Sequence, residues 1–418
     1  MTVPAQTDLV QLARAARPAG RRLAKLDATD RTEVLLAIAR SVEAAYSAVL
    51  EANRRDVERA VASGLAAPLV DRLRLDSNRM ATIVNAVREV AQLPDPVGSV
   101  VKTSQRPNGL SVERRRIPLG VILIVYESRP NVTVDAAALC LRSGNAAILR
   151  GGSEAFETNQ ALGRAIGRAL LERGLPAEVV QLVPTTDRDA MRRLLQLEDD
   201  IDLCIPRGGE SLIRFVVEHA RVPVIKHSRG NCHVYVDGAA DFTKALAICD
   251  NAKTQRPGVC NAVETILVDA AIADTFVPQL VERLAAVELR ADARARAIVP
   301  SLPAATDEDF HHEFLDLVCA LGITDGVEQA IAHIQRFTSN HTEAIVTEDA
   351  TTAERFLREL DSSTVIHNAS TRFADGGELG LGAEIGISTS KLHAYGPMGA
   401  EELTTTQFVV RGNGQIRT

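Results

Sequence analysis

Hydrophobic and polar residues follow different repeats in different parts of the chain. Up to the break at Pro94-Asp95-Pro96, apolar residues recur every three or four positions, as in 34–42 and 83–90, which predicts amphipathic helices. Between 100 and 117, polar and apolar residues alternate on both sides of a turn at 107–109, which predicts an exposed β-hairpin arm. The three consecutive arginines 114–116 are interpreted as a solvated face of this arm, with an anion site as the alternative.

From Leu119 onward, short apolar runs alternate with helical stretches, first up to Ile225. The runs predict strands at 120–126, 146–149, 179–183, 201–205 and 222–225, and the stretches predict helices at 132–141, 155–171, 188–195 and 210–219. Continuous apolar strands are typical of parallel sheets covered on both faces. The alternation therefore predicts a doubly wound α/β fold, which binds ligands at the carboxyl ends of its strands.

A second alternating block follows Asp237. It predicts helices at 242–252, 272–284, 327–334 and 352–360 and strands at 263–268, 317–321, 344–346 and 364–366. The glycine-rich segment 371–386 is interpreted as a loop. The tail 403–411 has strand composition, and we expect it to pair with the hairpin arm.

Composition narrows the function classes. Lys plus Arg number 47 against 54 Asp plus Glu, a net charge of −7, and aromatic residues are 3%, which argues against a nucleic-acid partner. Apolar runs are too short to span a membrane. Six scattered cysteines predict reduced thiols without disulfides or a bound metal. The Arg-rich N-terminus is interpreted as a helix rather than a transit peptide because Asp8 interrupts its positive charge. We expect a cytoplasmic enzyme.

Cys260 is the strongest chemical candidate. It lies in Gln255-Arg256-Pro257-Gly258-Val259-Cys260-Asn261, where Pro and Gly predict a turn between a helix and a buried strand. A thiol on such a turn has a defined position, with backbone N–H groups nearby for an oxyanion, and Arg256 favours the thiolate. The alternative is a small buried hydrophobic residue, the usual role of a free cysteine.

Three strand-to-helix junctions are candidates for ligand binding. At Ser128–Asn131, the Asn131 amide either donates to an oxyanion or caps the helix. Arg150-Gly151-Gly152-Ser153-Glu154 and Arg207-Gly208-Gly209 let the backbone approach a phosphate, although neither matches G-x-G-x-x-G, and a tight connection is the alternative. His311-His312-Glu313 lacks a nearby third metal ligand, so no metal site is predicted.

Longer motifs resemble a known family. The segments 126–135, 143–152, 205–209, 226–237 and 255–262, together with 380–394, are similar to gamma-glutamyl phosphate reductases of the aldehyde dehydrogenase superfamily. The likeness covers nearly the whole chain, with departures at Tyr395 and Gln407. It implies an aldehyde dehydrogenase-like fold: a Rossmann-type NADP-binding domain (1–99 and 119–236, with part of 370–400), an α/β catalytic domain (237–369) carrying Cys260, and a β oligomerisation arm (100–118 and 401–418).

The resemblance also implies an activity and roles for individual residues. The implied reaction is NADPH-dependent reduction of L-glutamyl 5-phosphate to L-glutamate 5-semialdehyde through a thioester, a step of proline biosynthesis. Cys260 and Asn131 would be catalytic, and Arg129, Arg256 and Asn261 would contact the substrate. The implied NADP(H) contacts are Arg150, Gly151, Gly152, Ser153, Glu154, Gly208, Gly209 and Glu313. A homo-oligomer and a glutamate 5-kinase partner are also expected.

Two other functions stay open at this point. One is a CoA-dependent acylating semialdehyde dehydrogenase of the same superfamily. The other is a Cys-dependent hydrolase with a distant histidine base, since no histidine lies in the Cys260 motif. Hydrolytic superfamily members carry a water-activating Glu, and the corresponding segment here has no carboxylate between Val222 and Val236.

Overall fold

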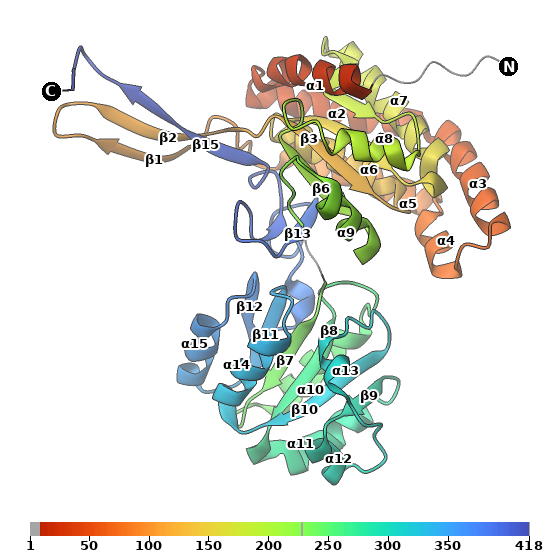
Figure 1. The fold of residues 1–418 in the computed structure, drawn as a ribbon, viewed down its shortest axis with the longest axis vertical. Helices are drawn as coiled ribbons and strands as arrows, with labels where there is room; N and C mark the ends of the chain where they lie inside the picture. The colour runs from red at the N-terminus through yellow and green to blue at the C-terminus, as the bar shows by residue number, and fades with distance from the viewer. Residues whose placement is uncertain (1–8, 227–228, 418) are drawn as a thin grey trace. The chain divides into compact units, whose positions relative to one another are not determined.

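The computed structural model describes residues 9–226 and 229–417. The chain divides into two compact units (Figure 1). Unit 1 comprises Met1–Lys226, Gly380–Gly386 and Met398–Thr418, and unit 2 comprises His227–Leu379 and Ile387–Pro397. None of the helices in the described ranges is long and apolar enough to cross a membrane.

Unit 1 contains the helical N-terminal region and the first alternating block. Its helices are α1 (Leu9–Ala24), α2 (Ala28–Ala44), α3 (Tyr46–Ala62), α4 (Ala67–Leu73), α5 (Ser77–Gln92), α6 (Pro130–Arg142), η1 (Ser153–Ala155), α7 (Phe156–Glu172), η2 (Ala177–Val179), α8 (Arg188–Leu194) and α9 (Glu210–His219). Its strands are β1 (Val100–Gln105), β2 (Ser111–Pro118), β3 (Val121–Tyr126), β4 (Ala146–Gly151), β5 (Val180–Leu182), β6 (Leu203–Arg207) and β15 (Thr404–Arg411).

The sheet of unit 1 is parallel, in the order β5-β4-β3-β6. Every residue of β3 is buried, as the continuous apolar run predicted. One face of the sheet packs against α1, α8 and α9 through Leu123, Ile148 and Val216, among others. Asp27 and Asp76 begin α2 and α5 by accepting backbone N–H bonds at 2.8 Å.

Unit 2 contains the second alternating block. Its helices are α10 (Phe242–Thr254), α11 (Ala270–Arg283), α12 (Ala293–Ile298), α13 (Asp307–His311), α14 (Gly326–Phe337), α15 (Ala350–Glu359) and η3 (Thr371–Phe373). Its strands are β7 (Cys232–Val236), β8 (Val263–Asp269), β9 (Glu288–Ala291), β10 (Val318–Thr324), β11 (Thr342–Val346) and β12 (Thr364–His367). The unit boundaries also cross β13 (Gly386–Ser388) and β14 (Gly396–Met398), which pair with each other.

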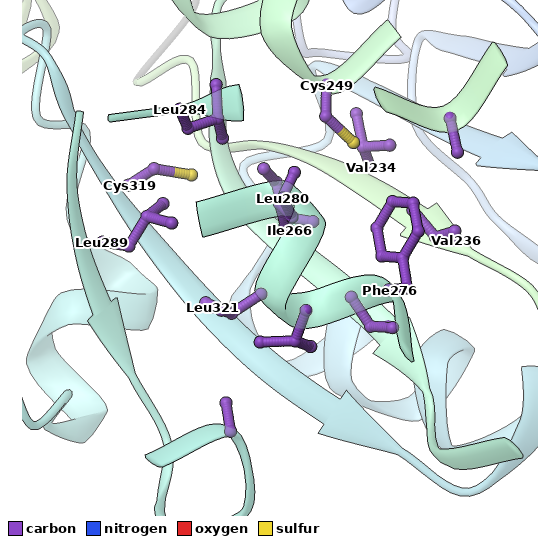
Figure 2. Packing of buried hydrophobic residues seen from close by; sticks show 14 of the residues in the cluster. Val234, Val236, Cys249, Ile266, Phe276, Leu280, Leu284, Leu289, Cys319 and Leu321 are labelled. Carbon is purple, nitrogen blue, oxygen red and sulfur yellow. The ribbon is translucent and has the colours of Figure 1, made fainter. Parts of the chain in front are cut away.

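The parallel sheet of unit 2 has the order β12-β11-β7-β8-β10-β9. Side chains alternate between its two faces, so Val234 and Ile266 pack with α10 and α11, whereas Tyr235 and Leu267 pack with α14 and α15. Figure 2 shows the first of these cores, where Phe276 and Leu280 of α11 lie over the strands. This core holds the two elements that flank Cys260, namely α10 and β8.

The arm is a three-stranded antiparallel sheet in the order β1-β2-β15 (Figure 1). The C-terminal strand pairs with β2 from Thr404 opposite Pro118 to Arg411 opposite Ser111, which confirms the expected pairing of tail and hairpin. Arg115 and Arg411 both bind Glu113, while Arg116 binds Glu401. Arg115 and Arg116 are thus engaged by carboxylates of the arm, and both side chains are half-buried, so the expected solvated face is only partly solvated.

Two sequence expectations about strands were wrong. The segment 232–236 was placed in the cofactor domain, but β7 pairs with β8 and β11 in unit 2. The segment 222–225 forms only an isolated bridge between Val224 and Cys204, because Pro223 has no N–H to donate to a ladder. The short elements β9, α12 and α13 were not anticipated because their apolar runs are too brief to show a period.

Candidate active site

Cys260 lies on the turn between α10 and β8, as the Pro-Gly pair predicted. It is half-buried, whereas the other five cysteines are buried. Burial raises the pKa of Cys140, Cys204, Cys249 and Cys319 above their ordinary value, so these thiols are poor nucleophiles. Cys260 is therefore the thiol that the fold leaves accessible.

The backbone of the Cys260 turn is held by hydrogen bonds from residues of other segments. The Cys232 thiol donates to the Cys260 carbonyl oxygen at 3.2 Å, and burial raises the Cys232 pKa, so that thiol keeps its hydrogen. The Thr371 hydroxyl donates to the Asn261 carbonyl at 2.7 Å. A Cβ on Gly230 would lie 2.0 Å from the Cys260 oxygen, so only glycine fits beside the turn. These contacts hold the peptide planes that follow Cys260 and Asn261, and the Ala262 N–H holds the plane that carries the Cys260 N–H by donating to the Val259 carbonyl at 3.0 Å.

Asn261, expected to contact the substrate, has a different role in the structure. Its side chain is buried, and its amide nitrogen donates to the Ala374 carbonyl at 3.0 Å and to the Arg372 carbonyl at 3.4 Å. An amide nitrogen has two hydrogens, so both are engaged. The Asn261 side chain therefore positions the turn, and its expected contact with the substrate stays a prediction. Arg256, in contrast, is exposed.

Arg372 was missed by the sequence reasoning, which treated 371–386 as a loop. Its Nε donates to the Gln255 side chain at 2.8 Å, at the start of the Cys260 turn. Burial is the largest influence on Arg372 and lowers its pKa, and Asp375, Arg256 and Cys260 act on the same guanidinium. No local pattern marks Arg372, because its contacts span more than 100 residues of sequence.

A fully buried ion pair lies beneath the same turn. Lys253 Nζ is 2.6 Å from Glu264 Oε2, and neither side chain is exposed. The other Glu264 oxygen accepts the Leu315 N–H at 3.2 Å, two residues after Glu313. Leu315 has a φ of +55°, in the left-handed region that non-glycine residues rarely adopt. The pair thus ties the segment carrying Glu313, an expected cofactor contact, to α10 and β8.

In unit 1, Asn131 lies in the first turn of α6, not at its cap. The N-cap is Arg129 and Pro130 is the first helical residue, so the capping alternative for Asn131 was wrong. Asn131 is exposed, and its amide donates to Asp135 at 2.9 Å, which leaves its second amide hydrogen available. Burial raises the Asp135 pKa to about 6, while the Asn131 bond and Arg207 lower it.

The first glycine junction contains an internal carboxylate. Glu154 accepts the N–H and the hydroxyl of Ser128 at 2.7 and 2.6 Å, and a Cβ on Gly152 would lie 2.4 Å from Glu154. Gly151 needs its hydrogen because Asn159 would be 2.1 Å from a Cβ there. Arg150 donates to the Thr186 carbonyl at 2.7 Å, whereas Ser153 is exposed.

The second glycine junction also holds a carboxylate of the same chain. Glu127 follows β3 and accepts the Gly209 N–H at 2.9 Å, at the beginning of α9. A Cβ on Gly208 would lie 2.4 Å from Glu127. The sequence reasoning missed Glu127, although a charged residue directly after a buried strand is a signal that could have revealed it.

Two features of these junctions fit a nucleotide cofactor: the glycine backbone, which a phosphate can approach, and the buried cation Arg150. A Cβ at Gly152 or Gly208 would first meet the movable carboxylate ends of Glu154 or Glu127, and the buried Arg150 Nε has no hydrogen-bond partner among the described residues. A guanidinium N–H left without a partner is costly unless a ligand completes it. The carboxylates of Glu127 and Glu154 are the local feature that opposes a phosphate at these turns.

Comparison with known proteins defines the class. Residues 2–316 match the model of the aldehyde dehydrogenase family, whose members use a nicotinamide cofactor. The fold is also shared with an acetylating aldehyde dehydrogenase from Geobacillus thermoglucosidasius, at a TM-score of 0.69, 16% identity and 98% coverage of both chains. The chain therefore has the fold of an aldehyde dehydrogenase and belongs to that family of oxidoreductases.

Nearer relatives narrow this class. A gamma-glutamyl phosphate reductase from Desulfatibacillum aliphaticivorans is 53% identical over 98% of this chain and 99% of its own length. One from Geobacter sp. strain M21 is 52% identical over 97% and 98%. The crystal structure of gamma-glutamyl phosphate reductase from Thermotoga maritima matches with a TM-score of 0.96 and 44% identity, covering 98% of this chain and 100% of that one. The chain belongs to the gamma-glutamyl phosphate reductases of the aldehyde dehydrogenase family.

Proposed function

We propose that the protein reduces L-glutamyl 5-phosphate to L-glutamate 5-semialdehyde and phosphate with NADPH, a step of proline biosynthesis. The observation that carries this proposal is the Cys260 turn. It presents one half-buried thiol on a backbone fastened by Cys232 and Thr371, within a chain more than 50% identical to named reductases of this substrate.

The chemistry follows from a nucleophilic thiolate. The Cys260 sulfur attacks the acyl carbon, a C–S bond forms, and the C–O bond to phosphate breaks, so a thioester remains on Cys260 and phosphate leaves with the bonding electrons. The cofactor supplies hydride when bound. The resulting thiohemiacetal oxygen then re-forms the carbonyl, the C–S bond breaks, and Cys260 is regenerated as the thiolate.

Asn131 and the Cys260 N–H are the proposed oxyanion donors. Asn131 keeps one amide hydrogen beyond its bond to Asp135, and the Cys260 backbone is held in one orientation. Arg129 and Arg256 are proposed to contact the substrate. Arg150, Gly151, Gly152, Ser153, Glu154, Gly208, Gly209 and Glu313 are proposed around NADPH, with the unpartnered Arg150 Nε supporting a cofactor phosphate.

The proposal includes protection of the thioester from water. Glu343, a buried carboxylate of unit 2, accepts the His233 backbone N–H at 3.1 Å and the hydroxyls of Thr338 and Ser362, and it lies 2.8 Å from His233 Nδ1. Glu264 is paired with Lys253. A carboxylate whose oxygens already accept hydrogen bonds or pair with a cation is a poor general base. We expect hydrolysis of the acyl-enzyme without NADPH to be slow.

One assay separates the proposed function from its rivals. The protein is incubated with glutamate 5-semialdehyde and NADP, with phosphate or CoA as the acyl acceptor. The proposal expects NADPH formation only with phosphate, whereas CoA-dependent formation would indicate the acylating alternative. Release of glutamate from glutamyl phosphate without NADPH, corrected with Cys260→Ala, measures hydrolysis. Hydrolysis as fast as reduction would contradict the thioester protection and favour a thiol hydrolase.

We also propose an assembly and a location. The arm exposes Val100, Val101, Phe408 and Val410, apolar side chains that a second copy of the chain would cover. A homo-oligomer through the arm is therefore proposed. Light scattering of Phe408→Glu against the unmodified protein tests the arm.

A glutamate 5-kinase is the proposed partner that supplies the labile acyl phosphate. The proposed location is the cytoplasm, because six free thiols suit a reducing compartment.

A further inference from the structure

Two guanidinium groups belong to the surroundings of the Cys260 thiol. Arg256 lies four residues before it, and Arg372 reaches the same turn from η3, about 110 residues later. Arg256 and Cys260 both act electrostatically on Arg372. Like charges placed near each other repel, so such a pair costs free energy unless an anion completes it.

Arg372 is held in place at both ends of its side chain. Its backbone carbonyl accepts the Asn261 amide at 3.4 Å, and its neighbour Thr371 donates to the Asn261 carbonyl at 2.7 Å. Its Nε donates to Gln255 at 2.8 Å. One guanidinium edge is thus used for positioning, and the Nη atoms are directed by a fixed plane, which suits bidentate binding of an oxyanion.

One acidic group, Asp375, acts on the Arg372 guanidinium and offsets part of its positive charge. Asp375 is the largest electrostatic influence on Arg372, and its Oδ1 accepts the Gly377 N–H at 3.0 Å. Asp375 is thus one carboxylate against the two guanidinium groups of Arg256 and Arg372. Arg372 is half-buried, so its charge is less screened than that of a fully exposed arginine.

We propose that Arg372 binds the phosphate group of the acyl phosphate, and inorganic phosphate in the reverse reaction; this inference rests on the proposed function. The choice between the anionic groups of the substrate follows from covalent distance. The phosphorus is two bonds from the carbon that Cys260 attacks, whereas the α-carboxylate carbon is four bonds away. A cation fixed at the cysteine turn therefore faces the leaving phosphate and stabilises the charge it gains as the C–O bond breaks.

Kinetics of the reverse reaction test this assignment. We expect Arg372→Ala to raise the KM for phosphate about 10- to 100-fold, the range for losing a hydrogen bond to a charged group, with less than a twofold change in the KM for the semialdehyde. Arg372→Lys should recover part of the loss. Arg294→Ala is the matched control, because Arg294 is an exposed arginine of unit 2 paired with Asp325 at 2.7 Å. A rise in the KM for the semialdehyde alone would assign Arg372 to the carboxylate and overturn the proposal.

A cofactor-free measurement keeps the test independent of turnover. Phosphate should slow alkylation of Cys260 by iodoacetamide in the wild-type protein and in Arg294→Ala, but much less in Arg372→Lys and Arg372→Ala. Equal protection in all four proteins would overturn the proposal. If the wild-type protein does not use phosphate as acyl acceptor, the proposed function itself fails. If the wild-type protein uses phosphate and the Arg372 variants have the same KM for phosphate, only the role of Arg372 fails.

Discussion

The glycine turns of unit 1 and the cysteine turn of unit 2 use backbone donors in opposite ways. In unit 1, Glu127 and Glu154 take the N–H groups of Gly209 and Ser128, at the positions where a cofactor phosphate is expected. In unit 2, the carbonyls of Cys260 and Asn261 accept bonds from Cys232 and Thr371, and no carboxylate takes either bond; the Arg372 guanidinium, on which Cys260 acts electrostatically, belongs to the same turn.

The difference shows that the backbone shape of a turn and the charge around it are set by different residues. Glycines in sequence predict where a backbone turns tightly and can be approached closely, and a Cβ at either junction would meet a glutamate carboxylate. They do not predict which anion comes near, because a glutamate of the same chain satisfies the same N–H. At Cys260, the guanidinium groups of Arg256 and Arg372 instead favour an anionic nucleophile and an anionic substrate. Mutations at the two kinds of turn should therefore have different effects.

The largest effect is expected at the cysteine turn. Cys260→Ser should lower the rate of reduction by at least about 10³, because an alcohol without a general base is a poor nucleophile. NADPH binding, measured by fluorescence titration, should stay near the wild-type value. Cys319→Ser is a matched control, since that thiol is buried in the same unit. Activity of Cys260→Ser within tenfold of wild type would show that another residue is the nucleophile.

Asn131→Ala tests whether unit 1 contributes a catalytic donor. We expect turnover to fall about 10²–10³-fold, the scale for one oxyanion donor, with a small change in substrate KM. Asn131→Asp provides a comparison, because it keeps the size of the side chain but removes the donor. If only the KM changed and turnover did not, Asn131 would be a binding residue without a role in the transition state.

The sequence predicted the scaffold better than the contacts between distant segments. The wholly apolar run of β3 and the Pro-Gly turn before Cys260 are local features, and both were confirmed. The sheet that contains β7 could not be deduced, because Val-Tyr-Val suits either sheet and its partners are set by pairing with residues 30 to 110 positions away. Arg372 was missed for the same reason, since η3 meets the cysteine turn only through tertiary contacts.

Asp135 should make the stability of the protein depend on pH. Burial raises its pKa from 3.8 to about 6, so the folded chain holds this proton where the unfolded chain has lost it. The free energy of unfolding should therefore fall as pH rises from 4 to 6, by at most about 3 kcal/mol at about 1.4 kcal/mol per pKa unit. Asp135→Asn, which is always neutral, should remove this part of the fall in urea unfolding at pH 4.5 and 7.5. An unchanged pH dependence in the variant would show that Asp135 titrates normally.

The smallest effect is expected at the second glycine turn. Glu127→Gln keeps an oxygen that can accept the Gly209 N–H, but it removes a negative charge from the beginning of α9. Two like charges about 4 Å apart repel by about 1 kcal/mol in water and by more where solvent is partly excluded, so we expect NADPH to bind about 3- to 10-fold more tightly. The gain should shrink at high salt, because ions screen the repulsion. Glu210→Gln is the matched control, since Glu210 is the next residue after Gly209 and pairs with Arg214. Weaker NADPH binding in Glu127→Gln would mean that the carboxylate helps to hold the cofactor, and that internal carboxylates are part of the binding site in unit 1 rather than competitors for it.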